Sequence, residues 1–216
     1  MIKENTLKII NSLPENVELV VATKTRSLPE IKEALSAGAR IIGENYVQEA
    51  QTKHALIGSG AQWHLIGHLQ KNKAKSAVKI FDMIQTLDSL ALAEAIDKEC
   101  KKIDKIMPVL IEINSAAEPQ KNGILPGDCD EFLEKLFSLT SIKLMGLMTM
   151  GPFFSDPEKL RPYFKITKEL FEGLKERYSS LSDFKYLSMG MSSSYKVAIE
   201  EGSNMVRVGT NIFGER

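Results

Sequence analysis

The chain has 216 residues, a length that suits one domain or a tight pair of domains. Its hydrophobic fraction of 43% and charged fraction of 26% are ordinary for a soluble globular protein with one sizeable core. Lysine plus arginine (28) balances aspartate plus glutamate (28), so the net charge gives no electrostatic reason to expect nucleic acid or a membrane as a partner.

The first 13 residues mix charged side chains with single apolar ones, which predicts a short amphipathic helix rather than a signal peptide. Nothing in the sequence approaches the roughly 18 consecutive apolar residues that a membrane span needs. The two cysteines, Cys100 and Cys129, form no Cys-x-x-Cys motif. A reducing compartment fits them better than a disulfide scaffold, so we expect a cytoplasmic protein.

Short apolar runs alternate with longer stretches of helical periodicity along the whole chain. The predicted strands are 19–22, 40–43, 63–66, 83–87, 109–113, 143–148, 186–189 and 205–208. The predicted helices between them are 29–37, 46–57, 89–102, 130–139, 157–178 and 192–201. This alternation is typical of an α/β protein with a parallel sheet, and eight strands favour a single closed (β/α)8 barrel over residues 1–216. An open doubly wound sheet with fewer strands is the alternative.

Residues that favour helix ends support these boundaries. Ser27 and Glu30 have the spacing of a capping box, and Pro29 falls near the start of the same helix. Gly38 and Gly202 follow two helical stretches, where a left-handed residue commonly ends a helix.

Lys24 lies two residues after the first apolar run, at the end of a barrel strand where active sites form. A lysine among apolar walls loses solvation, which favours the neutral amine that forms an imine. An ordinary solvated lysine that pairs with Glu44 is the simpler interpretation of this position.

A serine-rich turn after the seventh strand and a glycine after the eighth indicate a phosphate site. Gly190 and Gly209 allow close approach of the backbone to an anion, and Ser192 or Ser193 can add a hydroxyl. The loops after strands seven and eight are where this barrel commonly binds phosphate. A helix start capped by serine would look similar, but two such segments at the expected strands strengthen the prediction.

With these segments placed, the chain resembles the pyridoxal phosphate homeostasis protein family, which is related to the amino-terminal barrel of alanine racemase. The resemblance covers nearly the whole chain and is specific only when its motifs are taken together. The motifs are VVATKT at 20–25, GENYVQE at 43–49, WHLIGHLQKNK at 63–73, LMGLMTM at 144–150, LSMGMS at 187–192 and VRVGTNIFG at 206–214.

The resemblance implies pyridoxal 5'-phosphate (PLP) as cofactor, held on a fold-type III barrel without the second β domain of the racemases. The implied cofactor-binding residues are Lys24, Asn45, His64, Met148, Ser188, Met189, Ser192, Arg207, Gly209 and Thr210. By this resemblance Lys24 forms the internal aldimine. Ser192, Gly209 and Thr210 hold the phosphate.

The resemblance also places Asn45, His64 and Met148 around the cofactor ring and Arg207 at its pyridine nitrogen. Arginine is a donor that keeps its proton, so it disfavours a protonated pyridinium and weakens the ring as an electron sink. A cofactor held in this way is less prone to stabilise a carbanion than one paired with a carboxylate.

Two positions depart from the family pattern. The family often has an acidic residue near Ser194 and a small residue where Asn211 stands, so the phosphate contacts are left open. His64 and His68 are four residues apart, but Gly67 lies between them and the sequence offers no third ligand at a suitable spacing, so we predict no metal site.

Three functions are compatible with a reactive lysine in this barrel. They are a PLP carrier that buffers the cofactor or supplies it to apo-enzymes, a PLP-dependent amino acid racemase or decarboxylase, and a class I aldolase-like Schiff-base enzyme. The sequence ends soon after the last strand, which leaves no second domain to supply a partner acid or base for racemisation. We therefore expect a monomeric carrier without a catalytic role, with weak racemase activity as the alternative.

Overall fold

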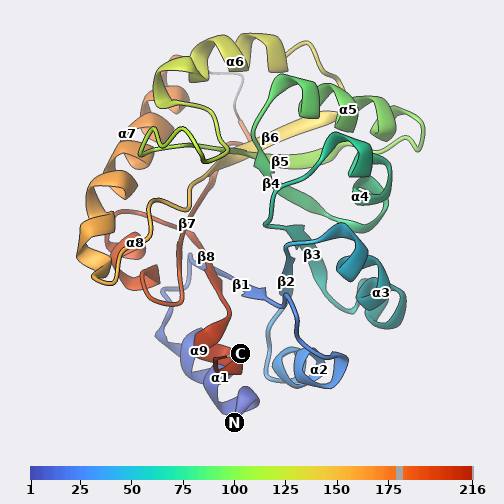
Figure 1. Cartoon of the computed structure of the whole chain (residues 1–216), viewed down its shortest axis with the longest axis vertical. Coiled ribbons are helices and arrows are strands. Elements are labelled where there is room, and N and C mark those ends of the chain that lie inside the picture. The colour runs from blue at the N-terminus through green and yellow to red at the C-terminus, as the bar shows by residue number, and fades with distance from the viewer. Residues whose placement is uncertain (179–181, 216) are drawn as a thin grey trace.

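The computed structural model describes residues 1–178 and 182–215, and its strands form one closed parallel barrel in chain order (Figure 1). The strands are β1 (Glu18–Ala22), β2 (Ile41–Glu44), β3 (Gln62–Leu65), β4 (Met83–Leu87), β5 (Met107–Glu112), β6 (Ile142–Met148), β7 (Tyr186–Met191) and β8 (Met205–Val208). The first strand pairs with the last, with Leu19 opposite Val206. The predicted closed barrel is therefore confirmed, and the open-sheet alternative is wrong.

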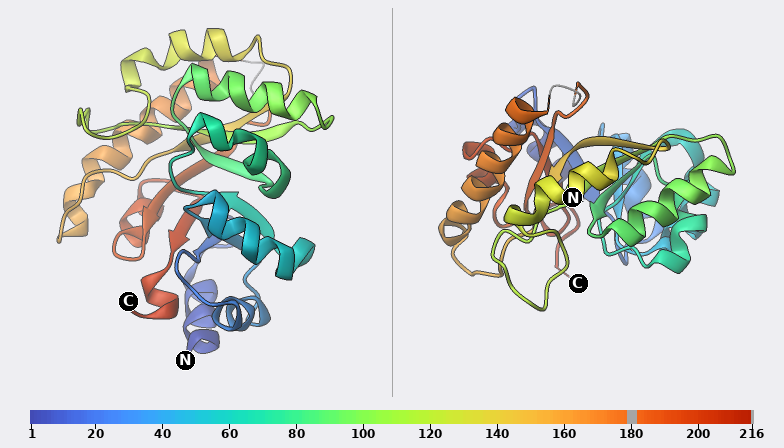
Figure 2. Two further views of the ribbon diagram at one scale, coloured as in Figure 1. Left: turned by 45° about the vertical axis from the view of Figure 1, so that its right-hand side comes forward. Right: turned by 90° about the horizontal axis from the view of Figure 1, so that it is seen from above.

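Helices surround the barrel on its outer side (Figure 2). They are α1 (Ile2–Ser12), α2 (Leu28–Ser36), α3 (Val47–Ile57), α4 (Ala74–Ile80), α5 (Leu90–Lys101), α6 (Cys129–Leu136), α7 (Arg161–Arg177), α8 (Tyr195–Glu200) and α9 (Thr210–Phe213). The sequence did not predict α4 or α9, because segments of seven and four residues are too short to show a helical period. Within the described ranges, no helix has both the length and the apolar character needed to cross a membrane.

The predicted helix ends are confirmed where the sequence marked them. The Ser27 backbone N–H and hydroxyl both donate to Glu30 Oε2 at 2.7 Å, which forms the capping box of α2. Gly38 and Gly202 have φ angles of +101° and +89°, the left-handed conformation expected after a helix. These local signals fix where the chain leaves each helix and returns to the barrel.

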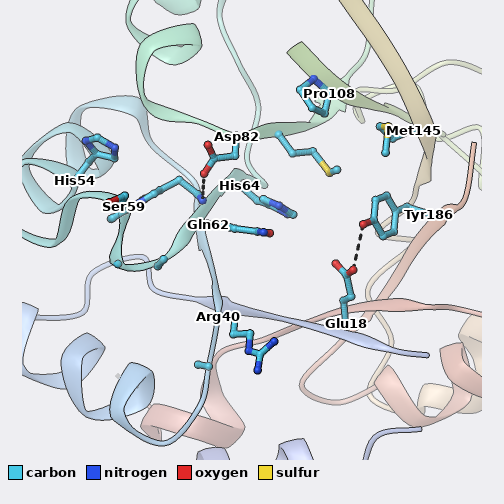
Figure 3. A pocket seen from close by; sticks show the side chains of 15 residues that line it. Glu18, Arg40, His54, Ser59, Gln62, His64, Asp82, Pro108, Met145 and Tyr186 are labelled. Carbon is cyan, nitrogen blue, oxygen red and sulfur yellow. Dashed lines mark hydrogen bonds between the residues drawn. The ribbon is translucent and has the colours of Figure 1, made fainter. Parts of the chain in front are cut away.

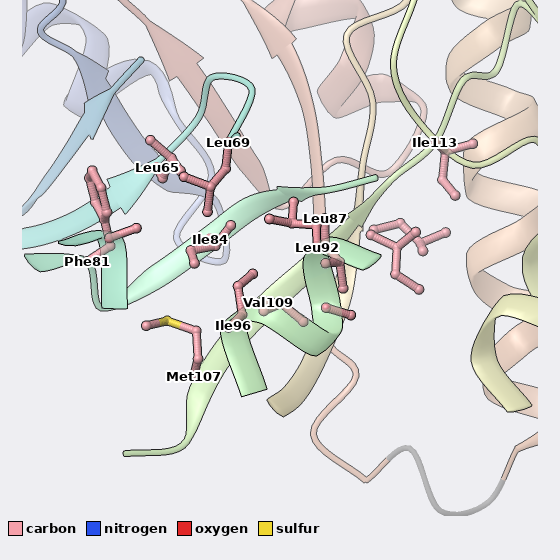
Figure 4. Packing of buried hydrophobic residues seen from close by; sticks show 14 of the residues in the cluster. Leu65, Leu69, Phe81, Ile84, Leu87, Leu92, Ile96, Met107, Val109 and Ile113 are labelled. Carbon is pink, nitrogen blue, oxygen red and sulfur yellow. The ribbon is translucent and has the colours of Figure 1, made fainter. Parts of the chain in front are cut away.

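The main core lies between the strands and the outer helices. Leu65, Ile84 and Val109 of β3, β4 and β5 belong to one buried cluster with Leu92 and Ile96 of α5 (Figure 4). All five side chains are buried. Burying an aliphatic side chain of this size contributes roughly 1.5–3 kcal/mol, so this layer holds the helices firmly on the barrel.

A second cluster fills the barrel itself. Its buried members are Val20, Ile41, Ile66, Met83, Leu110, Met148 and Met205. The barrel interior is therefore packed with side chains, as is usual for eight strands. Cavities remain at the two ends, and the polar residues that line them decide what the protein can bind.

Candidate functional site

A cavity of about 320 Å³ opens at the carboxyl-terminal end of the barrel. Its lining residues are Ala22, Lys24, Arg26, Asn45, Ile66, Met150, Met191, Ser192, Ser193, Arg207, Gly209 and Thr210. This is the end of the barrel at which enzymes of this fold place their active sites. The volume is at the lower end of the range of about 300–1,000 Å³ that is typical of small-molecule sites.

Lys24 is half-buried and follows β1, and hydrogen bonds fix the backbone on both sides of it. The Thr23 carbonyl accepts from Lys53 Nζ at 2.6 Å, and the Thr25 N–H donates to Glu49 Oε1 at 2.5 Å. Thr25 has a φ of +64°, a left-handed conformation that is uncommon for a β-branched residue. The segment that carries Lys24 is therefore held in one conformation at the edge of the cavity.

Glu44 is fully buried beside this segment and binds Lys53, not Lys24. Glu44 Oε1 accepts from Lys53 Nζ at 2.7 Å and from the Thr23 hydroxyl. Burial raises the pKa of Glu44, while the hydrogen bonds from Lys53 and Thr23 lower it. The alternative in which Lys24 pairs with Glu44 is wrong, and the Lys24 amine faces the cavity without that carboxylate as a partner.

The loops after β7 and β8 are joined at the cavity wall. Ser192 Oγ accepts from the Gly209 N–H at 3.1 Å, and Asn211 Nδ2 donates to the Ser192 carbonyl at 2.8 Å. Ser193 and Thr210 line the same wall. Asn211 thus ties the two loops together. The wall offers hydroxyl groups that can donate to an anion.

Arg207 lies at the inner end of this cavity and is only 3% exposed. Nη1 donates to the carbonyl and hydroxyl oxygens of Ser188 at 2.9 and 2.6 Å, and Nη2 donates to the Thr149 carbonyl at 2.9 Å. Two of its five N–H groups have no acceptor within residues 1–178 and 182–215. Burial lowers the pKa of Arg207 to about 10, while the charge of Glu112 acts in the opposite direction and raises it. The guanidinium therefore keeps its charge at neutral pH.

Six of the ten predicted cofactor-binding residues line this cavity, and four lie elsewhere. Met148 belongs to the cluster inside the barrel, and Met189 is buried in the core under the helices. Ser188 lies beneath Arg207, and His64 lines a different cavity of about 700 Å³ at the amino-terminal end of the barrel. The cofactor contacts of all ten residues remain predictions.

The lining also contains residues outside the ten predicted cofactor-binding residues, among them Arg26 and Met150. Arg26 lies two residues beyond Lys24; it pairs with Glu30 at 3.4 Å and donates to the Gly214 carbonyl at 2.5 Å. Met150 follows β6 and is 39% exposed. The strand-end rule already pointed to Met150, whereas Arg26 lies two residues beyond the position that the rule marked after the first strand.

Glu112 ends β5 and is a buried acid close enough to Arg207 to interact with it. Burial, reinforced by the charge of Asp88, raises the pKa of Glu112 from its ordinary value of 4.5 to about 7. Glu112 also lines a neighbouring cavity of about 200 Å³, which shares Met150 with the Lys24 cavity. An acid whose pKa is raised towards neutral pH by burial thus lies in the cavity that adjoins the Lys24 cavity.

This shift predicts a specific dependence of stability on pH. The folded state holds the Glu112 proton more tightly than the unfolded chain, so this residue's contribution to stability is greatest below pH 4.5 and falls as pH rises towards 7. A Glu112→Gln variant should therefore gain stability relative to wild type by about 2 kcal/mol between pH 5 and pH 8. Urea unfolding at both pH values measures this gain, and an equal difference at the two pH values would contradict it.

Residues 1–216 match the family model described as the alanine racemase N-terminal domain. A pyridoxal phosphate homeostasis protein of Aquifex aeolicus is 40% identical over 200 residues, which cover 92% of this chain and 87% of that protein. The protein of the same name from Escherichia coli K12 is 37% identical and covers 94% of this chain and 87% of its own length. The chain belongs to the pyridoxal phosphate homeostasis protein family.

Solved structures agree with membership in this family. PipY of Synechococcus elongatus PCC7942 superposes with a TM-score of 0.93 without PLP and 0.91 with PLP bound, at 34% and 33% identity. Both comparisons cover 99% of this chain and 100% of PipY. Alanine racemase of Clostridium difficile shares 18% identity at a TM-score of 0.79 over 59% of its own chain, a likeness that shows the barrel fold.

Proposed function

We propose that this chain binds PLP through Lys24 and takes part in PLP homeostasis, by buffering the cofactor or supplying it to apo-enzymes. The observation that carries the proposal is that one cavity holds a half-buried lysine, a hydroxyl-lined wall and a charged arginine. The relatives named above are pyridoxal phosphate homeostasis proteins, and one solved neighbour is a PLP complex.

The chemistry of these residues fits the phosphate, the aldehyde and the ring nitrogen of PLP. Ser192 and Thr210 can donate to a phosphate, and a side chain on Gly209 would lie 3.2 Å from the Ala22 carbonyl and narrow the cavity there. The Lys24 amine suits the aldehyde carbon. The two unused N–H groups of Arg207 suit an unprotonated pyridine nitrogen, which is an acceptor.

When bound, PLP supplies an aldehyde that reacts with amines and a ring that can withdraw electrons. Lys24 would hold the cofactor covalently, and the serine and threonine hydroxyls would orient its phosphate. Arg207 would hold the ring nitrogen as a donor that keeps its own proton, and would therefore disfavour protonation of that nitrogen. These residues favour holding the cofactor over catalysis with it.

The lining of the cavity also favours a carrier over a racemase. Racemisation needs a proton acceptor and a proton donor on opposite faces of the substrate carbon. Within the described residues, Lys24 is the one amine in the lining, and no tyrosine, cysteine or histidine joins it. Weak racemase activity is the alternative, and it is an outcome of the test below.

The same proposal covers the organisation and location of the protein. We place residues 1–216 in one cofactor-binding domain that acts as a monomer in the cytoplasm and hands PLP to enzymes that require it. Cys100 and Cys129 are free and buried, and burial raises the pKa of the Cys100 thiol to about 11 and of the Cys129 thiol to about 12. Unpaired, unreactive thiols of this kind are compatible with a reducing compartment.

A visible absorption spectrum tests the central claim. Wild type reconstituted with PLP should show an imine band that borohydride bleaches, and mass spectrometry should find the reduced adduct on Lys24. Lys24→Ala should lose the band and bind PLP at least about 100-fold more weakly, roughly 3 kcal/mol. Lys32→Ala, at an exposed lysine of α2, is the matched control and should keep the band.

Two outcomes would overturn the proposal. A wild-type protein that stays colourless with PLP would end the PLP assignment, and an unchanged band in Lys24→Ala would move the attachment to another lysine. Adding L-alanine or D-alanine to the reconstituted protein then separates the carrier from the racemase. Loss of optical purity at a rate dependent on the protein would establish the racemase.

A further inference from the structure

A row of buried polar side chains crosses the barrel interior below the Lys24 cavity. It consists of His64 on β3, Gln85 on β4, Ser188 on β7 and Arg207 on β8, and none of the four is more than 3% exposed. Gln85 Nε2 lies 2.9 Å from His64 Nδ1, and the Ser188 hydroxyl donates to Gln85 Oε1 at 2.7 Å. Arg207 Nη1 then donates to Ser188 Oγ at 2.6 Å.

Each hydrogen bond in this row fixes the direction of the next. Arginine has only donors, so Ser188 Oγ must accept from Arg207. The single hydroxyl proton of Ser188 is then free to go to Gln85 Oε1, which leaves the Gln85 amide nitrogen to donate to His64 Nδ1. His64 Nδ1 is therefore an unprotonated acceptor, and the imidazole proton is on Nε2.

The far end of the row is uncharged and faces the opposite end of the barrel. Burial lowers the pKa of His64 to about 3, so its ring stays neutral at physiological pH. His64 lines the cavity of about 700 Å³ there, beside Gln62 and across from the hydrogen-bonded pair of Tyr186 and Glu18 (Figure 3). A neutral ring with an accepting Nδ1 holds Gln85 in one amide orientation.

We propose that Gln85, held by His64, is a positioning residue that keeps Ser188 as an acceptor and thereby orients Arg207 towards the cofactor cavity. The inference rests on the proposed function, because it assigns the purpose of the row to the arginine that meets PLP. By this inference His64 and Ser188 support Arg207 from beneath and do not contact the cofactor directly. Without Gln85, the hydroxyl proton of Ser188 has lost its acceptor, and the Ser188 hydroxyl can rotate. The hydrogen bond from Arg207 Nη1 to Ser188 Oγ then no longer holds the guanidinium in one orientation.

The test compares Gln85→Met, which keeps the volume but removes the amide oxygen and the amide NH2, with Leu110→Met. Leu110 is equally buried inside the barrel and lies outside the row, so its variant controls for a repacked interior. Nitrogen-15 NMR of the cofactor-free proteins reads the His64 ring and the hydrogen exchange of the Arg207 guanidinium. A pH titration of the visible spectrum and the Kd for PLP read the loaded proteins.

In the cofactor-free protein, Gln85→Met should speed hydrogen exchange at Arg207 and shift the His64 Nδ1 resonance. In the loaded protein, the same variant should change the pH titration of the visible spectrum and weaken PLP binding by about tenfold. Leu110→Met should leave all of these near wild type. Ser188→Ala should reproduce the effect of Gln85→Met on Arg207, and the double variant should add little to either, because both remove the same link.

Unchanged Arg207 exchange in Gln85→Met, or fully additive effects in the double variant, would overturn the inference. The NMR measurements need no cofactor, so they test the row even in a protein that fails to take up PLP. A protein with the expected NMR changes and no PLP binding would refute the proposed function and leave the hydrogen-bonded row in place. The two failures are therefore distinguishable.

Discussion

Replacing Lys53 with methionine is expected to destabilise the protein by about 3–5 kcal/mol, the usual cost of leaving a buried charge without its partner. Lys53 Nζ donates to the Thr23 carbonyl, Glu44 Oε1 and Glu49 Oε1 at 2.6, 2.7 and 2.7 Å, so all three of its protons are used. Methionine fills a similar volume but donates to none of these oxygens. Glu44, with no exposed surface, would then have to lose its charge or remain unpaired.

The measurement is urea unfolding of wild type, Lys53→Met and the double variant Lys53→Met/Glu44→Gln. The double variant removes the buried charge together with its partner and should recover a large part of the lost stability, since replacing both members of a buried pair is often nearly neutral. Equal destabilisation in the single and double variants would show that the Lys53 packing, not the ion pair, carries the effect.

The same substitution should reach the cofactor site. Lys53 anchors the Thr23 carbonyl, and Glu49, which also binds Lys53, accepts from the Thr25 N–H. Both anchors flank Lys24. We expect the folded fraction of Lys53→Met to bind PLP more weakly, because the segment that presents the amine loses its fixed conformation.

The strand ends were the part of the site that the sequence could reveal. Lys24, Ser192 and Gly209 lie within three residues of the ends of apolar runs, and parallel strands bring all such positions to the same end of a barrel. The order of apolar runs and helical stretches was enough to predict the barrel. A local pattern suffices for these features, because each depends on residues that are close together in the sequence.

The depth of each side chain inside the barrel could not be read in the same way. His64 and Met148 lie on strands that the sequence identified, yet neither lines the Lys24 cavity. Their height along the barrel axis depends on the stagger between neighbouring strands, and register shifts interrupt the pairing of β4 with β5 and of β5 with β6. Stagger arises from contacts between distant segments, so periodicity alone does not contain it.

One such shift depends on Gly146, and Gly146→Ala is expected to destabilise the protein by at least about 4 kcal/mol. A Cβ at Gly146 would lie 1.8 Å from the Tyr186 carbonyl oxygen and 2.7 Å from its carbon, which are backbone atoms of the neighbouring strand β7. Its φ of +153° adds strain for any residue with a side chain. Relief would require β6 and β7 to separate, which breaks the closure of the barrel.

Gly127→Ala is the control, since a Cβ there meets nothing within 4 Å, and it should change stability by no more than about 0.5 kcal/mol. Urea unfolding of both variants makes the comparison, and a Gly146→Ala protein as stable as Gly127→Ala would contradict the prediction. The consequence extends to the site, because β6 leads into Thr149, whose carbonyl accepts from Arg207. A glycine that contacts no ligand thus sets the strand spacing on which the position of the arginine depends.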